Sequence, residues 1–310
     1  MVRSRKLPIA LLAATLAVTA AGPAAARPAP AGPSKAAACG ALFDDFDYSS
    51  RTDPNFTGHD WSVRTSPGGP GVGGATWAAS NISFPVVDGQ KSLQLRASTD
   101  GTAGGTTHAQ VQQNRERFFA GTYATRFKFS DTPVSGGDGN LVNQTFYAIS
   151  PLDGDWDPTY SELDFSEYLP NGGWGETGPT NFVTSWNTYQ VEPFDGWRKT
   201  DAMRRSFDGW HTLVTTVAEG HVKYYIDGEL VGDHTVDDQG HDVYPRRPMT
   251  LNYNQWFIDL SGHPGGTSVW AQSADWVYYA KDEVLTPAAA TARVNDYRTA
   301  GTTHADTISC

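Results

Sequence analysis

The segment Tyr160-Ser-Glu-Leu-Asp-Phe-Ser-Glu-Tyr168 places three carboxylates within a run of apolar and aromatic residues. Acids are depleted in strands, whereas the residues around these three favour one. Successive side chains of a strand point to opposite faces, so Glu162 and Asp164 share a face. Leu163 and Phe165 point the other way, toward a core. The segment is therefore predicted to be a strand in a sheet with one buried face and one open face.

Simple alternation places Glu167 on the core face of this strand, where an ionised carboxylate is very costly. A β-bulge at Phe165-Ser166 removes the conflict. One extra residue returns Glu167 to the face of Glu162 and turns Tyr168 inward. The sequence thus predicts a bulge, with three carboxylates gathered on the open face.

The rest of the chain consists mostly of short β-rich runs separated by turn clusters. Strands are predicted at residues 93–97, 122–129, 213–217, 221–226, 229–231 and 275–280, with an Asp-Gly turn at 227–228. A helical pattern is found only at residues 288–297, after Pro287. Many short strands without intervening helices indicate an all-β fold, either an antiparallel sandwich or a barrel.

The amino-terminal residues have the pattern of a signal peptide over residues 1–26. A basic start is followed by an apolar run at 7–20 and an Ala-Ala-Ala cleavage site at 24–26, with a second such site at 36–38. Residues 27–38 are rich in Pro and Ala and are expected to form a disordered leader. The folded domain is expected at 39–280, with a helix and tail at 281–310 packed on it. The expected product is a secreted, extracellular protein without a membrane-spanning segment.

The net charge and the cysteine content limit the classes of molecule that this protein is expected to bind. The net charge of −11 argues against nucleic acid and anionic membranes, and we expect a monomer. Cys39 and Cys310 are the two cysteines, too few for a zinc site. Export permits a disulfide, so a bond between them is predicted.

The three carboxylates suit glycoside hydrolysis. Enzymes that retain anomeric configuration need two carboxyl groups ~5–5.5 Å apart, which Glu162 and Glu167 can provide by leaning together. Asp164, between them, is expected to hydrogen-bond Glu162, and its charge helps to keep one acid protonated. A solvated acidic strand face and a calcium loop are the alternatives. A calcium loop favours Gly, Asn and Asp at alternate positions over Leu and Phe.

The pattern Glu162-x-Asp164-x-x-Glu167 resembles the catalytic signature of glycoside hydrolase family 16. Further segments are similar to strands of that family: residues 43–46, 143–149, 207–213, 222–228, 248–254 and 274–279. The resemblance implies a concanavalin-like jelly-roll sandwich of two antiparallel sheets with a cleft across the concave one. It assigns Glu162 as nucleophile, Glu167 as acid/base and Asp164 as the assisting acid. No cofactor is required for this chemistry.

The resemblance implies an endo-acting hydrolase that cuts a β-linked polysaccharide through a covalent glycosyl-enzyme. The acidic surface favours a neutral polysaccharide over a sulfated one. The bulged signature is typical of members that act on β-1,3-glucans and β-galactans, which favours a β-1,3-type glucan. Ser161, where the family usually has Gly, and residues 169–174 depart from the familiar laminarinases and lichenases. A non-catalytic, lectin-like sandwich and a transglycosylase are the competing hypotheses.

Four tryptophans near the expected cleft are candidates for sugar stacking: Trp156, Trp174, Trp186 and Trp256. Tryptophan is also highly buried on average, so core packing stays open for each. Asp275 resembles the position that holds a structural calcium in some members of the family.

Overall fold

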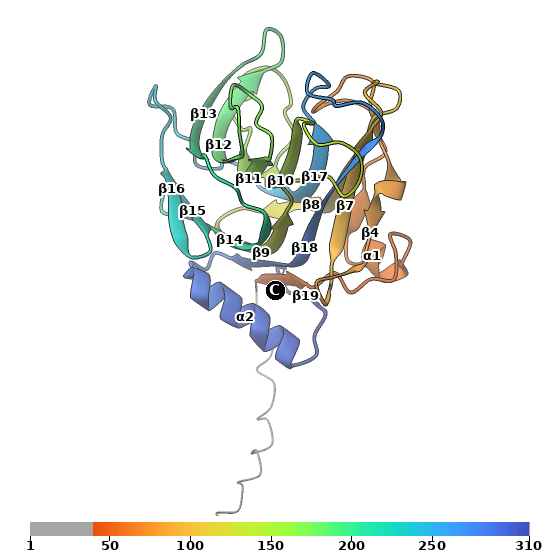
Figure 1. Ribbon diagram of the computed structural model, residues 1–310. Coiled ribbons are helices and arrows are strands. Elements are labelled where there is room, and N and C mark those ends of the chain that lie inside the picture. The colour runs from red at the N-terminus through yellow and green to blue at the C-terminus, as the bar shows by residue number, and fades with distance from the viewer. Residues whose placement is uncertain (1–39, 310) are drawn as a thin grey trace, which may run out of the picture. The chain divides into compact units, whose positions relative to one another are not determined.

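The computed structural model describes residues 40–309, which form a sandwich of two β-sheets (Figure 1). The first sheet, here called the cleft sheet, contains in spatial order β2 (Trp61–Val63), β8 (Thr107–Phe118), β17 (Met249–Phe257), β10 (Val142–Ile149), β11 (Glu162–Leu169), β12 (Thr180–Gln190) and β13 (Asp195–Met203). All neighbours in this sheet are antiparallel. The predicted strand at residues 160–168 is β11, near the middle of the sheet.

The second sheet, here called the outer sheet, contains β4 (Ile82–Ser83), β7 (Leu93–Thr99), β18 (Ser268–Lys281), β9 (Gly121–Phe129), β14 (Gly209–Ala218), β15 (His221–Ile226) and β16 (Glu229–His234). β1 (Ala41–Asp44) pairs with the end of β18, and β19 (His304–Asp306) pairs with β1. β8 links the sheets, because its start pairs with β7 and, in parallel, with β3 (Thr76–Trp77). β5 (Val86–Val87) and β6 (Gln90–Lys91) form a separate hairpin.

The jelly-roll prediction is confirmed. The six strands predicted outside residues 160–168 all lie within observed strands, and the one at 160–168 begins two residues before β11. In the hairpin between β15 and β16, Asp227 and Gly228 have φ angles of 51° and 85°, as a two-residue type I′ turn requires. Between the sheets, the ring of Phe146 lies 4.8 Å from that of Phe165 and 4.7 Å from that of Tyr253. Aromatic packing of this kind stabilises the sandwich and fixes the position of β11.

The β-bulge on β11 is confirmed by the register of both neighbouring strands. On β10, Tyr147 pairs with Asp164 but the adjacent Phe146 pairs with Ser166, so Phe165 is the extra residue. The pairing with β12 shifts at the same place. The hydrophobic core includes Leu163, Phe165 and Tyr168. This is the alternation of faces that the predicted bulge requires.

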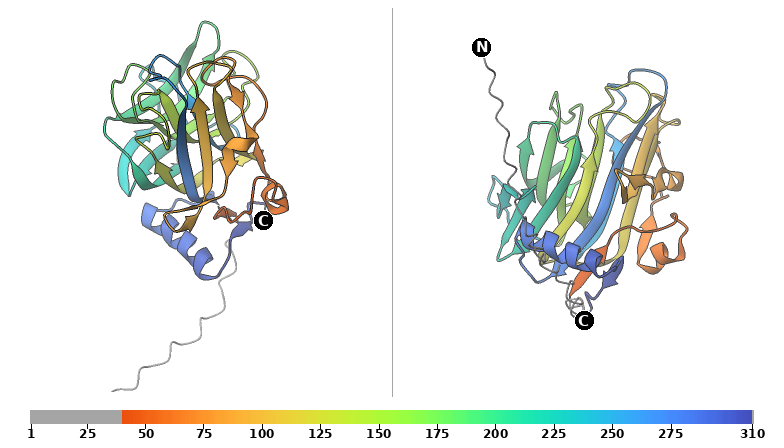
Figure 2. Two further views of the ribbon diagram at one scale, coloured as in Figure 1. Left: turned by 45° about the vertical axis from the view of Figure 1, so that its right-hand side comes forward. Right: turned by 60° about the horizontal axis from the view of Figure 1, so that its bottom comes forward.

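The helix α2 (Pro287–Thr299) matches the helix predicted at residues 288–297. The hydroxyl of Thr286 caps it by accepting the N–H of Ala289. Figure 2 shows the helix crossing the outer sheet. There the ring of Tyr297 stacks on Phe43 at 4.8 Å. Two short turns were not predicted, α1 (Pro54–Gly58) and a 3-10 turn (Ala79–Asn81), since so few residues show no helical period.

Several expectations concern residues outside the described range. The signal peptide (1–26), the leader (27–38), Cys39 and Cys310 all lie there, so both cysteines of the predicted disulfide are undescribed. Among residues 40–309, no helix has the length and apolar character needed to cross a membrane.

Candidate active site

The cleft lies on the face of the cleft sheet that points away from the core and has a volume of about 1260 Å³. Its floor consists of side chains from β8, β10, β11, β12, β13 and β17. Glu162, Asp164 and Glu167 all line it. The bulge is the reason that Glu167 joins the other two, because it restores the face that plain alternation would reverse.

Glu162 sits at the start of β11, where a neighbouring tyrosine fixes its orientation. The hydroxyl of Tyr160 donates to Oε2 of Glu162 at 2.5 Å. Burial raises the pKa of Glu162 well above its usual range, and the charge of Asp164 adds to this, whereas the Tyr160 hydrogen bond acts in the opposite direction. Tyr160 has its own pKa raised by burial and by Glu162, so it stays a hydrogen-bond donor.

Asp164 is held from the next strand. The indole N–H of Trp186 donates to its Oδ2 at 2.9 Å, and Trp186 pairs with Glu162 in the register of β12 on β11. The expected partner was Glu162, but among the described residues Trp186 provides the hydrogen bond. Burial raises the pKa of Asp164 to about 7, opposed by Trp186 and by the charge of Arg198. Arg198, which pairs with Trp186 from β13, lies over the indole ring at 4.6 Å.

Glu167 receives a hydrogen bond from β10, where the side-chain amide of Asn143 donates to its Oε1 at 2.9 Å. Burial raises the pKa of Glu167 well above its usual range, and the charge of Asp164 raises it further. Three carboxyl groups sharing one partly desolvated site cannot all ionise near neutral pH. The site therefore keeps at least one protonated carboxyl group, which acid-assisted displacement requires as its acid.

The four tryptophans have different positions. Trp174 and Trp256 line one end of the cleft with their rings 5.9 Å apart, and Trp174 is 49 % exposed. Trp186 lines the floor, where it holds Asp164. Trp156 stays a prediction for sugar stacking, and it is not among the residues that line this cleft in the structure. Its ring packs on Trp197 at 4.8 Å, and its indole N–H donates to the side-chain oxygen of Gln190.

Sequence reasoning missed several residues of the cleft. Tyr189, Val191 and Phe194, from the end of β12 and the turn after it, line the cleft, and Phe194 is 63 % exposed. Tyr160 and Asn143 were also missed as partners of the acids. Same-face spacing offered a signal for Tyr160, which stands two residues before Glu162. Asn143 needed the strand pairing, which depends on the fold.

The calcium expected at Asp275 does not fit the structure. The carboxylate of Asp275 is fully buried, and both of its oxygens accept hydrogen bonds from the guanidinium of Arg298, at 2.7 and 3.1 Å. Arg126 adds a third such bond at 3.3 Å. Two guanidinium cations already surround this carboxylate, and their positive charge opposes the approach of a calcium ion. It instead fixes α2, through Arg298, to the outer sheet.

A comparison with protein-family models matches residues 74–278 to the model described as "Glycosyl hydrolases family 16". This chain belongs to that family. It is a glycoside hydrolase and acts on O-glycosyl bonds. The match spans the strands of the cleft sheet from β8 to β17 and includes the three carboxylates of β11. No curated protein sequence matches the chain.

Solved structures with the same fold are distant in sequence. The β-glucanase of Bacillus licheniformis has a TM-score of 0.55 and 18 % identity, with 78 % of this chain and 98 % of that one covered. A family 16 endo-glucanase from Bacteroides ovatus has a TM-score of 0.56 and 16 % identity, covering 76 % and 98 %. LamA from Zobellia galactanivorans, in complex with laminaritriose and laminaritetraose, has a TM-score of 0.52 and 16 % identity, covering 79 % and 100 %. At these identities the likeness establishes the fold.

Proposed function

We propose that this enzyme is an exported, retaining endo-hydrolase of a β-linked neutral polysaccharide, with preference for a β-1,3-type glucan. The observation that carries the proposal is the bulged strand β11, which brings Glu162, Asp164 and Glu167 to one face of an open cleft. A cleft open along the sheet accepts the interior of a chain, which suits endo action. Export follows from the signal-peptide pattern of residues 1–26.

In the proposed mechanism, Glu162 attacks the anomeric carbon while Glu167 protonates the departing glycosidic oxygen. The hydrogen bond from Tyr160 favours the ionised form of Glu162, as a nucleophile requires. Burial and the charge of Asp164 raise the pKa of both glutamates, so Glu167 can carry the proton that an acid donates, and the assignment of the two roles rests on the family signature. Glu167 then deprotonates the water that hydrolyses the glycosyl-enzyme.

Asp164 is proposed as the assisting acid. Its hydrogen bond from Trp186 fixes the carboxylate beside Glu162. When negative charge on Glu162 is consumed by attack on the sugar, repulsion between the two groups falls. Asp164 thereby favours formation of the covalent intermediate and, by its charge, reprotonation of Glu167.

The roles of the two glutamates are tested by Glu162→Gln and Glu167→Gln. Each variant is expected to lose nearly all activity on laminarin with the fold intact by circular dichroism. Glu116→Gln is the matched control, because Glu116 forms a partly exposed ion pair with Arg247 outside the cleft. Azide should partly restore Glu167→Ala on an activated aryl glycoside, since the glycosyl-enzyme still forms there. Near-normal turnover by either Gln variant contradicts the assignment.

The stereochemistry and the substrate need separate measurements. NMR of the first-formed sugar is expected to show the β-anomer, and an initial α-anomer would contradict direct attack by Glu162. A panel of laminarin, barley β-glucan, xyloglucan, agarose and galactan tests the preference, and the highest kcat/KM is expected on laminarin. A lectin-like protein would bind these polymers without releasing reducing ends. A transglycosylase would yield longer oligosaccharides in the presence of excess acceptor.

A further inference from the structure

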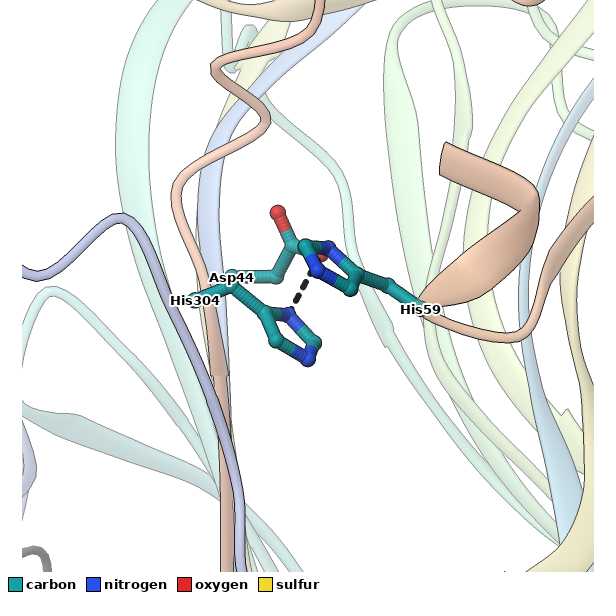
Figure 3. Close-up of side chains that lie close together, drawn as sticks. All are labelled: Asp44, His59 and His304. Atoms are coloured by element: carbon teal, nitrogen blue, oxygen red, sulfur yellow. Dashed lines mark hydrogen bonds and ion pairs between the residues drawn. The ribbon is translucent and has the colours of Figure 1, made fainter. Parts of the chain in front are cut away.

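A cluster of three side chains with metal-binding chemistry lies at the junction of both ends of the folded chain, apart from the cleft. Asp44 is the last residue of β1, His59 follows α1, and His304 begins β19 (Figure 3). Each offers one ligand atom, and the three atoms all lie within 4.8 Å of one another. None of the three residues lines the cleft.

Strand pairing brings two of the ligands together. Asp44 and His304 are direct partners in the register of β1 and β19, and Nδ1 of His304 lies 3.2 Å from Oδ2 of Asp44. Zinc bonds of about 2.0–2.2 Å to nitrogen and oxygen place tetrahedral ligands about 3.4 Å apart. The aspartate–histidine pair therefore already has nearly the spacing of two ligands on one ion.

The third ligand is His59, whose ring stacks on that of His304. The imidazoles of His59 and His304 are nearly parallel, with centroids 3.5 Å apart. Because an imidazole nitrogen binds a metal in the plane of its ring, the His59 ring must turn out of this stack to bind an ion held by the other two, and its ligand atom lies within 4.8 Å of theirs. The imidazoles are only partly buried whereas Asp44 is 1 % exposed, so an ion can enter from the histidine side with water completing its coordination.

Surrounding residues hold the carboxylate in place. The indole N–H of Trp61 donates to Oδ2 of Asp44 at 2.8 Å, and the hydroxyl of Tyr48 also binds that oxygen. The same hydroxyl contacts Nδ1 of His59 at 2.8 Å, which links two of the ligands. Outer hydrogen bonds of this kind orient the ligands in protein metal sites.

From this convergence we propose that Asp44, His59 and His304 bind a zinc ion, which fastens the carboxy-terminal strand β19 to β1 and to the segment after α1. Two imidazoles with one carboxylate suit zinc, whereas calcium and magnesium favour all-oxygen sites. Zinc binding at the ring nitrogen of His304 takes the place of its hydrogen bond to Asp44, and the displaced proton moves to the other ring nitrogen or to solvent. The proposal is independent of the substrate, because the site lies outside the cleft.

The test uses the mature chain without a polyhistidine tag, titrated with zinc chloride in a calorimeter. Wild-type protein is expected to bind one zinc ion, and the melting temperature is expected to rise by a few degrees with it. His59→Gln and His304→Gln should each weaken zinc binding by about ten-fold or more. Cobalt(II) should show the intense visible bands of a tetrahedral site in wild-type protein and lose them in both variants. Calcium should not bind.

The matched control is His241→Gln. His241 also pairs with a carboxylate, Asp237, at 2.8 Å and stacks on an aromatic ring, that of Trp197, but it has no second histidine. Its zinc affinity should equal that of the wild type. The absence of zinc binding by wild-type protein, or unchanged binding by both His59→Gln and His304→Gln, overturns the proposal. Should His304→Gln fail to fold, His59→Gln decides, because His59 lies outside any strand.

Discussion

Tyr160→Phe tests the environment of the proposed nucleophile. The variant keeps the aromatic ring, which packs against Tyr189 at 5.1 Å, and removes only the hydroxyl that donates to Glu162. Hydrogen bonds to charged groups contribute roughly 1.5–3 kcal/mol, and one pKa unit corresponds to about 1.36 kcal/mol. Loss of this bond should therefore raise the pKa of Glu162 by about 1–2 units.

The direction of the change in activity of Tyr160→Phe follows from the direction of the change in the pKa of Glu162. The hydroxyl favours the ionised carboxylate, so without it a smaller fraction of Glu162 is ionised at any acidic pH. A nucleophile must be ionised, and the acidic limb of kcat/KM should move to higher pH by about 1–2 units. Because the three carboxyl groups titrate together, this limb reports the cluster, but the direction of its movement is the same.

The assay is the pH profile of kcat/KM, measured by release of reducing ends from laminarin. Tyr253→Phe is the matched control, since its hydroxyl contacts Thr125 at 2.8 Å in the buried core. That variant should lose some thermal stability and keep the wild-type pH profile. If the acidic limb of Tyr160→Phe stays in place, or moves to lower pH, the hydrogen bond does not tune the nucleophile as argued.

Three further predictions concern the bulge, the cleft and the chain ends. Deleting Ser166 should abolish activity, because the deletion removes the bulge and turns Glu167 toward the core. Ser166→Ala keeps the residue count and should keep most activity. Similar activity of the two variants on laminarin would refute the argument that the bulge places Glu167 on the cleft face. Trp174→Ala should raise KM with little change in kcat, while Trp156→Ala should leave KM unchanged, and equal effects would contradict the placement of these rings. Cys39 and Cys310 should form a disulfide, since the backbone N–H of Gly40 lies 2.7 Å from the carbonyl oxygen of Thr307. Closing a loop of this length stabilises the folded state by up to ~5 kcal/mol. Two alkylatable thiols found by mass spectrometry in unreduced protein would exclude the bond.

Much of the site was predictable because one strand carries it. The alternation of side chains, with the cost of burying Glu167, was enough to predict the bulge and the shared face of the three acids. The hydrogen-bond partners of the acids depend on how β11 pairs with β10 and β12, the strands before and after it in the chain. Asn143 reaches Glu167 from 24 residues away, and Trp186 reaches Asp164 from 22 residues away.

The expectations for Trp156 and Asp275, like that of a hydrogen bond between Asp164 and Glu162, depended on neighbours that the sequence does not reveal. Trp156 and Asp275 were assigned from their position in the chain alone, and each was found with partners that sequence does not reveal. Trp156 packs on Trp197 from β13, and Asp275 is bound by Arg298 from α2. Whether a side chain is free to bind a ligand depends on which other side chains already contact it, and these contacts are known only once the fold is known.

The position of β1 has a consequence for how the chain reaches its folded state. The first strand of the sandwich pairs with β18 and β19, both synthesised last, so it has no sheet partner until nearly the whole chain has been made. Contacts of such long sequence separation make folding slow, and the sandwich cannot close while the polypeptide is still growing. A nascent chain that stays open suits passage through a translocation channel. For the exported enzyme proposed above, closure of the final strands would then follow on the far side of the membrane.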